Sequence, residues 1–575
     1  MTRPVSGRPG SVLLAVAAVL AAVVLVLAGC GAIPTSGPVG SIAPGNGSSG
    51  GGIYIFNPPG PRNGATPEEI IEGFYRAGIA PADDYRIARE YLAPAFAGEW
   101  RPVEQTLVYD SEPSIVDNVQ EGSYTVQVEA TAVIGEHGLR TDLPANSTRS
   151  AEVRLEQVDG EWRIVEAPDG TLVETGNFSV LFAPHLLYFY DATYAYAVPD
   201  VRWFANRQGL AATIVESLLA GPAPYLRNAA YSAFPEDAAL TRPAVPIDAG
   251  RATVDLAESV FVDASDLRRQ QMQQQLELTL SRLNNVTSVT MTVNQREVGL
   301  GAQAPGFTAA IVDPAVADTQ IAIAGGALVY YQGDGIVPVG GVPDISGHKP
   351  RDPAMGPGGN RYAFLDGGRT RLFTVDETGS VSTPVRGVDL VAPSIDTYGW
   401  TWTVAGGSHS HVMAVPASTA LDGPAREVAA GWLDDAEVLS LRVSRDGARV
   451  AVVARIGGDT GLYIGGIIRD SDGVPRGFTD PLEVPTAVPV SRAVWDSDIS
   501  VIVMRANAEE AVTAERIGLD GTSELFLPLQ GMIGLSAGPG ERRPVYAETP
   551  EGIYSRVGNS WSAQGRQASN LSYAG

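Results

Sequence analysis

Hydrophobic and polar positions are arranged differently in successive parts of this 575-residue chain. Residues 12–28 form an uninterrupted apolar run, whereas residues 30–52 are mainly Gly, Ser and Pro and have little to bury. We interpret the second stretch as a flexible tether, because sequences of this composition behave as random coils. From residue 53 onward, helical and strand periodicities predict a multi-domain protein with two α+β domains followed by an all-β region.

The first α+β domain is predicted to span residues 53–180. Its helices are predicted from apolar residues at helical spacing, namely Ile70, Ile71, Phe74 and Tyr75 after a capping box at Thr66, and then Tyr85, Ala88, Tyr91 and Leu92. Strands with period two follow at residues 124–130, 151–155 and 162–165, with a turn at Asp159-Gly160. This order resembles the cone-like nuclear-transport-factor fold. Such a domain either encloses a ligand pocket or serves as a spacer or docking module.

The second α+β domain is predicted to span residues 185–303. One amphipathic helix around residues 210–219 ends at Gly221-Pro222, and a strand follows at residues 252–256. A glutamine-rich helix then places Met272, Leu276, Leu280 and Leu283 on one stripe, and a strand over residues 286–293 leads into Asn294-Gln295. We interpret the glutamines as a solvated helix face rather than a binding strip.

Residues 304–575 contain short strands that repeat with a period of about 44 residues. Gly359 and Gly447 occupy equivalent turn positions two periods apart, with Gly399 between them, and further units lie at 491–503 and 533–547. A period of about 40–50 residues with short strands is typical of a β-propeller. We favour six blades over five or seven, with the first around residues 320–339 and the C-terminus completing it.

The start of the chain has the organisation of a secretory signal. Arg3 and Arg8 precede the apolar run, and Leu27, Ala28, Gly29 and Cys30 close it. These four residues resemble the lipobox of bacterial lipoproteins, in which residues 1–29 are removed and the Cys30 sulfur receives a diacylglyceryl group. The alternatives are a signal anchor that stays in the membrane, since 17 apolar residues are just enough to span it, and an ordinary cleavage site. Cys30 is the only cysteine in the chain and stands where lipidation requires it, which favours the lipoprotein and excludes disulfides.

The composition is that of a folded but strongly acidic protein, with 44% hydrophobic and 18% charged residues and a formal net charge of −25. Removal of residues 1–29 would leave 38 basic and 65 acidic residues, a net charge of −27. Such a surface is repelled by nucleic acid and by anionic lipid headgroups. We therefore expect no nucleic-acid partner, and we expect membrane attachment to depend on the lipid anchor.

The chain lacks the nucleophile-elbow, Walker and zinc-protease motifs. His409 and His411 would face the same way on a strand, but no third ligand is near them in sequence, and we expect exposed histidines at a blade edge. Asp470-Ser-Asp472-Gly473 lacks the later ligands of a calcium loop and predicts a turn. We therefore predict no catalytic residue, no metal site and no cofactor. A glycosidase needs only two carboxylates, so sequence motifs alone leave that alternative open.

The second domain, with its Leu218-Leu-Ala-Gly-Pro222, "Val-Asp-Leu" strand and "Thr-Leu-Ser" helix, resembles the GerMN domain. The propeller repeat resembles TolB-type blades. The chain resembles the actinobacterial lipoprotein LpqB family in the order of its parts, which is lipobox, N-terminal domain, GerMN domain and propeller. It also resembles that family in its last residues, Asn570-Leu-Ser-Tyr-Ala-Gly575. That resemblance implies a palmitate-bearing lipoprotein on the extracytoplasmic face of the cell membrane. It further implies a non-catalytic regulator of the MtrA–MtrB two-component system in cell-wall homeostasis and division. The expected partner is the extracytoplasmic domain of an MtrB-like sensor histidine kinase, contacted by the GerMN domain and the propeller; the alternative is a peptidoglycan-binding or wall-processing protein.

Overall fold

The computed structural model describes residues 58–575 except 82, 333–334, 407–408, 418–423, 506–510, 540–543 and 566–567. The predicted leader, lipobox and tether lie outside the described residues. The described residues belong to one compact unit. No helix among the described residues combines the length and apolar composition needed to cross a membrane.

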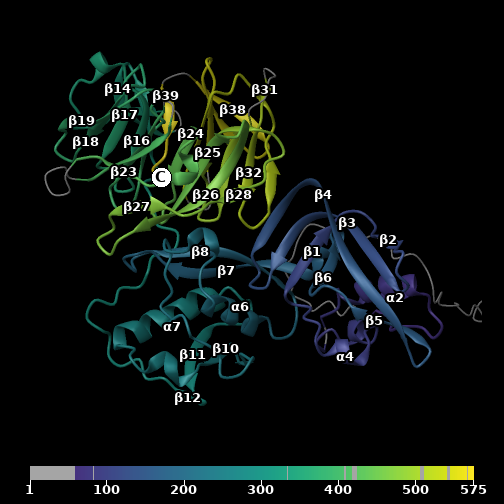
Figure 1. Ribbon diagram of the computed structural model, residues 1–575. Coiled ribbons are helices and arrows are strands. Elements are labelled where there is room, and N and C mark those ends of the chain that lie inside the picture. The colour runs from purple at the N-terminus through teal and green to yellow at the C-terminus, as the bar shows by residue number, and fades with distance from the viewer. Residues whose placement is uncertain are drawn as a thin grey trace, which may run out of the picture. The chain divides into compact units, whose positions relative to one another are not determined.

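The N-terminal domain combines four short helices with a six-stranded sheet of order β5-β4-β3-β1-β6, with β2 paired to β3 (Figure 1). The elements are α2 (Pro67–Ala77), α3 (Arg86–Arg89), α4 (Pro94–Ala97), β1 (Gln105–Tyr109), β2 (Ser114–Asp117), β3 (Ser123–Gly135), β4 (Arg140–Val158), β5 (Glu161–Glu166), β6 (Thr171–Glu174) and α5 (Thr175–Leu181). The capping box is confirmed, since Thr66 Oγ1 accepts from Glu69 N and Glu69 Oε2 accepts from Thr66 N. The three predicted strands lie within β3, β4 and β5. Asp159 and Gly160 form the β4–β5 turn with φ of 53° and 81°.

The predicted second helix is wrong in extent, because α3 is a single turn. Tyr85 has a left-handed backbone with φ of 57°, and the chain leaves the helix at Glu90. Backbone hydrogen bonds to β5 replace the helical ones: Ile164 N donates to Tyr91 O and Ala93 N donates to Ile164 O. The apolar residues of this stretch are nevertheless buried, so their spacing predicted burial correctly and the backbone conformation incorrectly.

The second domain combines a two-stranded hairpin, two helices and a four-stranded sheet of order β12-β11-β10-β9. The elements are β7 (Phe182–Tyr190), β8 (Ala197–Ala205), α6 (Leu210–Leu219), η1 (Pro224–Leu226), β9 (Ile247–Asp248), β10 (Arg251–Asp255), η2 (Glu258–Phe261), α7 (Asp266–Leu280), β11 (Ser288–Val293) and β12 (Arg296–Glu297). Both predicted helices and both predicted strands are present. The closing turn uses Asn294 and Gln295 in place of glycine, with φ of 50° and 64°. The Asp255 carboxylate holds this turn by accepting from Gln295 N at 2.9 Å.

The interpretation of the α7 glutamines as a solvated face is wrong. Gln275 is fully buried, donates to Tyr188 O and accepts from Ala233 N. Gln270 is also buried, donates to the carbonyl oxygens of Leu300 and Ala302, and accepts from Ala304 N. These amides satisfy backbone groups of neighbouring loops, because a buried backbone polar group needs a partner. They fix α7 within the domain.

The all-β region confirms the predicted propeller fold. Its sheets are β15-β14-β13-β39, β16-β17-β18-β19, β20-β21-β22-β23, β24-β25-β26-β27 with β28 on β26, β29-β30-β32-β33 and β35-β36-β37-β38; β31 and β34 form a separate pair. The first three sheets contain β13 (Gln320–Ala324), β14 (Ala327–Gln332), β15 (Gly335–Pro338), β39 (Ser569–Ser572), β16 (Arg351–Met355), β17 (Tyr362–Leu365), β18 (Arg371–Val375), β19 (Val381–Arg386), β20 (Ser394–Ile395), β21 (Thr401–Ala405), β22 (His411–Val415) and β23 (Arg426–Val428). The others contain β24 (Glu437–Val443), β25 (Arg449–Ile456), β26 (Asp459–Arg469), β27 (Pro475–Phe478), β28 (Leu482–Val484), β29 (Val490–Trp495), β30 (Ser500–Arg505), β31 (Ala511–Val512), β32 (Ala514–Gly518), β33 (Ser523–Leu525), β34 (Leu529–Gln530), β35 (Gly534–Ala537), β36 (Val545–Glu548), β37 (Ile553–Val557) and β38 (Ser560–Gly565).

The sheets close into a ring through their innermost strands. The strands β39, β16, β20, β24, β29 and β35 contact one another in this order, and β35 contacts β39. The predicted completion of the first sheet by the C-terminus is confirmed, because Ile321 pairs with Ser572 and Ile323 with Ser569. Figure 1 shows β39, in yellow, among the teal strands that begin the propeller.

The repeated glycines lie in equivalent turns, as predicted. Gly359, Gly399 and Gly447 have φ of 71°, 81° and 72° and each lies between the first and second strands of its sheet. Aspartates support many turns of the propeller: one carboxylate oxygen accepts from backbone N–H groups two to five residues later. This arrangement occurs at Asp366, Asp376, Asp396, Asp446 and Asp470.

Asp366 makes the stability of the propeller depend on pH. Burial alone would raise its pKa, but hydrogen bonds from the backbone and side chains of Arg371 and Thr370 lower the pKa to about 2. A depressed folded-state pKa stabilises the fold above the unfolded value of 3.8, and this contribution is lost as pH falls through about 2. We expect the stability difference between wild type and Asp366→Asn to shrink by about 2 kcal/mol between pH 6 and pH 2. Urea titrations at both pH values measure this difference, and an unchanged difference would contradict the assignment.

Candidate functional site

The predicted lipid-attachment site lies outside the described residues. This applies to Cys30 and to its lipobox neighbours Leu27, Ala28 and Gly29. Candidate sites within the described part of the chain are therefore a junction, two cavities and the histidine pair.

The histidine pair is exposed, as expected, and each imidazole has an acidic neighbour. His411 Nδ1 lies 2.6 Å from Glu427 Oε1, and His409 Nδ1 lies 3.4 Å from Asp435 Oδ1. No group of three or more His, Cys, Asp or Glu residues in the described ranges is arranged to hold a metal ion. The predicted turn at Asp470 is confirmed, because its carboxylate accepts from Asp472 N and Val474 N.

The second domain and the propeller share one hydrophobic core. Its buried residues include Leu226 and Ala230 of the second domain together with Leu462 and Ile464 of β26. Gly466 packs so closely that a Cβ there would lie 2.5 Å from Ala229 Cβ. Thr479 Oγ1 donates to Tyr225 O at 2.6 Å and accepts from Gly466 N at 2.7 Å. The hydrophobic core therefore continues from the second domain into the propeller, as it would within a single domain.

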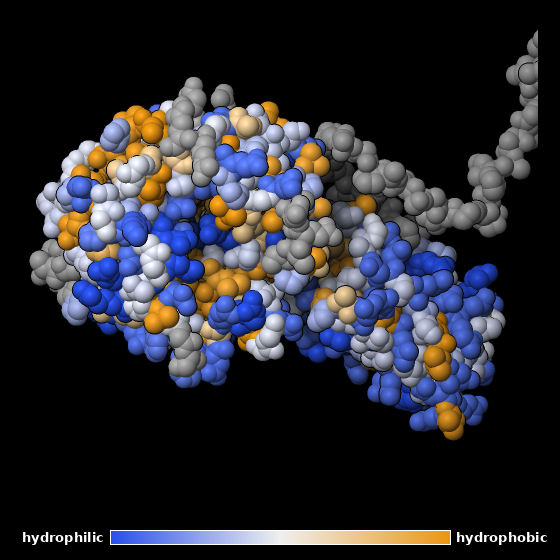
Figure 2. Space-filling view, turned by 90° about the horizontal axis from the view of Figure 1, so that it is seen from above, coloured by the Kyte–Doolittle hydropathy of each residue, from blue (hydrophilic) through white to orange (hydrophobic). Residues whose placement is uncertain are grey.

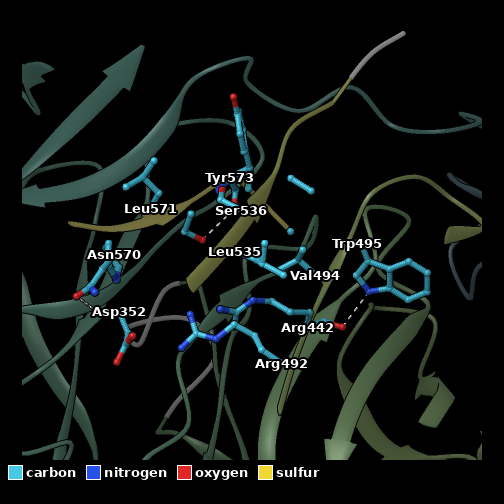
Figure 3. Close-up of a pocket in the computed structure, with 15 residues that line it drawn as sticks. Asp352, Arg442, Arg492, Val494, Trp495, Leu535, Ser536, Asn570, Leu571 and Tyr573 are labelled. Atoms are coloured by element: carbon cyan, nitrogen blue, oxygen red, sulfur yellow. Dashed lines mark hydrogen bonds between the residues drawn. The ribbon is translucent and has the colours of Figure 1, made fainter. Parts of the chain in front are cut away.

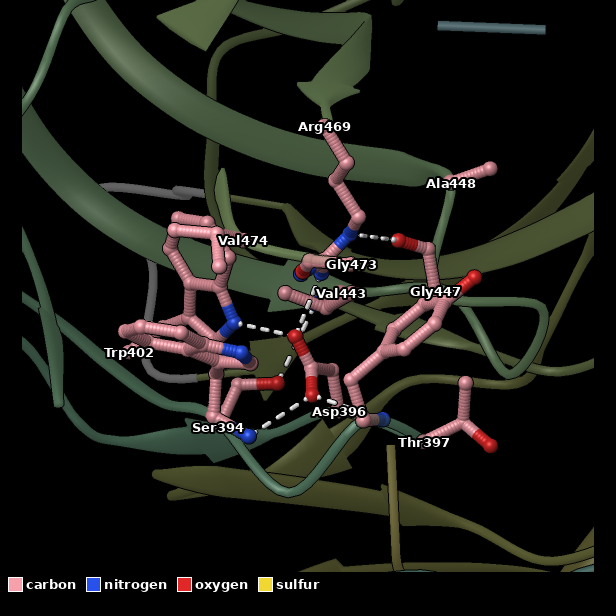
Figure 4. Close-up of polar contacts among 12 residues, drawn as sticks. Ser394, Asp396, Thr397, Trp402, Val443, Gly447, Ala448, Arg469, Gly473 and Val474 are labelled. Carbon is pink, nitrogen blue, oxygen red and sulfur yellow. Dashed lines mark hydrogen bonds and ion pairs between the residues drawn. The ribbon is translucent and has the colours of Figure 1, made fainter. Parts of the chain in front are cut away.

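A buried ion pair next to this core joins two propeller sheets (Figure 4). Asp396 Oδ2 accepts from Arg469 NH2 at 2.5 Å and from Trp402 Nε1 at 2.8 Å, and Arg469 donates to the carbonyl oxygens of Gly447 and Gly473. The side chains of Asp396 and Arg469 are 0% and 2% exposed. The Arg469 guanidinium also lies 4.4 Å from the ring centroid of Tyr398. The charges are thus fully enclosed and mutually satisfied.

Tyr398 carries this network into the second domain. Its hydroxyl donates to the carboxylate of Asp191, which also accepts from Thr193 N and Tyr196 N in the β7–β8 turn. Burial, followed by the Asp191 charge, raises the pKa of Tyr398, so the phenol remains a donor. Thr397 Oγ1 donates to Tyr196 Oη at 2.8 Å. The β7–β8 turn is therefore held by a propeller turn at several points.

The N-terminal domain contains a cavity of about 180 Å³ between α2 and the sheet. The phenol ring of Tyr75 lines it together with apolar residues of the sheet, which are Leu107, Val126, Val128, Val133 and Leu172. Gln105, Arg149 and Asp169 contribute polar groups. Apolar cavities of about 150 Å³ hold a molecule the size of benzene. A hollow of the size that the ligand-pocket interpretation requires is therefore present.

A second, smaller cavity lies among the innermost strands of the propeller (Figure 3). It is partly open and has a volume of about 30 Å³, enough for roughly one water molecule. Its wall includes Asp352, Arg442, Arg492, Ser536 and Asn570, which come from five different sheets.

Arg442 is the most buried charge of this cavity, with 8% exposure. Its NH1 donates at 3.0 Å to the carbonyl oxygens of Ala392, Pro393 and Leu441. Burial, and then the neighbouring Arg492 guanidinium, lower the pKa of Arg442 to about 10. Burial raises the pKa of Glu548, which accepts from the backbone N–H groups of Asn570 and Leu571 behind the cavity.

The sequence analysis missed the Asp396–Arg469 pair and the two cavity arginines. One signal was available: Arg442 lies in the segment Leu441-Arg-Val-Ser-Arg-Asp-Gly447, which leads into one of the repeated glycine turns, and there a charge interrupts an apolar strand. A charge at such a position is buried only if a partner meets it from elsewhere in the fold.

Three family models match successive parts of the chain. The model described as Lipoprotein LpqB, N-terminal domain, matches residues 60–179. The Sporulation and spore germination model matches residues 186–299, in agreement with the GerMN resemblance. The Lipoprotein LpqB beta-propeller domain model matches residues 326–571.

Several curated relatives are similar along most of their length. A protein named Lipoprotein LpqB from Thermobifida fusca is 27% identical, with 89% of this chain and 90% of the relative covered. Lipoprotein LpqB from Nocardia farcinica is 25% identical, with 95% and 94% covered. Among solved structures, TolB from Acinetobacter baumannii is 16% identical, with 44% of this chain and 66% of that chain covered, and has a TM-score of 0.34.

Proposed function

Because the chain belongs to the Lipoprotein LpqB family, we propose that it is a membrane-anchored accessory protein that regulates a sensor histidine kinase without catalysing a reaction. The anchor is a lipid on Cys30, added after a signal peptide is removed, with palmitate among its acyl chains. The folded domains lie on the extracytoplasmic face. There they bind the extracytoplasmic domain of an MtrB-like kinase in a two-component system that controls cell-wall homeostasis and division.

The observation that carries this proposal is the shared core of the second domain and the propeller. A specific, stable protein interface buries about 1,200–2,000 Å² in total, which favours a broad preformed surface. Domains that share a core present such a surface without reorganising on binding.

The polarity and charge of the surface favour a polar partner that is attracted electrostatically. Hydrophilic residues predominate on the face seen in Figure 2, and apolar residues interrupt them in small groups. With 65 acidic and 40 basic residues, the chain favours a basic partner surface. Opposite charges accelerate association, and salt screens them.

We expect the full chain, in detergent, to bind the kinase's extracytoplasmic domain saturably, with an association rate that falls about tenfold or more as ionic strength rises. Surface plasmon resonance measures both quantities. Sedimentation with purified peptidoglycan and no binding to the kinase would contradict the proposal and favour the wall-binding alternative. Hydrolysis of a muropeptide, abolished by replacing one Asp or Glu, would contradict the non-catalytic role.

Replacing acidic residues with lysine locates the kinase contact better than deleting the N-terminal domain does. Removal of the N-terminal domain would expose the aromatic cluster in which Phe178 packs against Trp203 of β8. Glu236→Lys with Asp237→Lys alters two exposed acids of the second domain, and Glu121→Lys with Glu136→Lys is the matched pair in the N-terminal domain. We expect only the first pair to slow association. Slowing by the second pair alone would assign the contact to the N-terminal domain.

A further inference from the structure

The centre of the propeller concentrates positive charge in an otherwise acidic chain. Arg442 and Arg492 lie side by side at the cavity wall (Figure 3). Across the described residues, no carboxylate lies within 4 Å of either guanidinium. Two acidic groups also line the wall: that of Asp352, which is paired with Arg351 at 2.9 Å, and that of Gly575, which carries the C-terminal carboxylate. Neither guanidinium makes an ion pair with them or with any other acid in the part of the chain that the structure describes.

This arrangement is costly unless an anion completes it. Burying a guanidinium without a counter-ion is unfavourable, and a second guanidinium nearby adds repulsion. The three carbonyl oxygens around Arg442 NH1 offset part of this cost, but they carry no net charge. Arg492 is half-buried and has no hydrogen-bond partner among the described residues.

We propose that Arg442 and Arg492 bind a phosphoryl group at the propeller axis. Guanidinium groups form paired, charge-assisted hydrogen bonds to phosphate oxygens, and two arginines match a dianion. Ser536 Oγ already accepts from Tyr573 N, which leaves its hydroxyl hydrogen for the ligand. The cavity volume of about 30 Å³ admits only part of a ligand, so the remainder would lie in the open cavity mouth.

The proposal is independent of the regulatory role and is tested on the full chain in detergent. Isothermal titration at constant ionic strength uses inorganic phosphate and, separately, glycerol phosphate. We expect saturable binding with one site, weakened about 10- to 100-fold by Arg492→Gln. Arg386→Gln, at an exposed position of β19, is the matched control and should bind as wild type does. Tighter binding of glycerol phosphate identifies a phosphoryl group on a larger molecule as the source, and equal binding identifies free phosphate.

Two results would overturn the assignment. One is the absence of saturable binding of either probe to the wild type at millimolar concentrations. The other is an unchanged affinity in Arg492→Gln. Because Arg442 also supports three backbone carbonyl groups, Arg442→Lys serves as the second variant. Thermal unfolding of each variant without ligand separates lost binding from lost folding.

Discussion

Replacing Asp396 with alanine should destabilise the propeller by about 3–5 kcal/mol, the cost of removing one partner from a buried ion pair. Arg469, with its side chain 2% exposed, would keep its charge without a counter-ion. The Trp402 indole N–H and the backbone N–H of Trp400 would also lose their acceptor. Differential scanning calorimetry should therefore show the transition that contains the propeller lowered by roughly 10 °C or more.

A second aspartate provides the matched control. Asp470 accepts from backbone N–H groups in the same way, but it lies in a solvent-facing turn and pairs with Arg476, whose side chain is 57% exposed. Exposed ion pairs contribute about 0–1 kcal/mol, so Asp470→Ala should cost much less than Asp396→Ala. Equal effects of the two variants would show that turn geometry, rather than the buried charge, determines the stability of this region.

Replacing Cys30 with serine should abolish lipidation completely, because a hydroxyl does not substitute for the thiolate nucleophile. Each methylene of an acyl chain contributes about 0.8 kcal/mol to membrane affinity, and two chains give stable attachment. The variant should retain residues 1–29 and carry no acyl group. Intact-mass spectrometry of membrane-extracted protein reports both changes.

Ser36→Ala is the control for this experiment, since it alters the predicted tether and leaves the four lipobox residues intact. It should be processed and acylated as wild type is. An unmodified mature N-terminus at another residue of the wild-type protein would contradict the anchor. It would favour the ordinary cleavage site considered in the sequence analysis.

Local patterns predicted those elements whose conformation depends on local interactions. The α2 capping box, the Asp159-Gly160 turn and the repeated glycines act through neighbouring residues, and each was found where expected. Even the pairing of β39 with the first sheet was predictable, because a repeat that lacks one strand implies a strand from elsewhere. The exception, α3, was decided by backbone pairing with β5, which lies about 70 residues further along the chain.

Buried polar groups were the main failure of prediction. Hydropathy assigns Gln275, Arg442 and Asp396 to the surface, because all three are polar. The partners that allow their burial are distant in sequence: 42 and 87 residues away for Gln275, 49 for Arg442 and 73 for Asp396. A polar residue is buried where the fold supplies the complementary donor or acceptor. The candidate anion site shares this property: each arginine is unremarkable in sequence, and only the ring of sheets brings the two together.

The pairing of β39 with β13 also determines when the propeller can be completed during synthesis. A chain that is made N-terminus first presents β13 about 250 residues before its partner β39. Until then, the edge of β13 has unpaired backbone groups and is open to wrong strand pairing. The α+β domains have no such dependence on the last residues. Chaperones and proteases would therefore meet an open ring, and chains truncated before residue 569 should be degraded selectively.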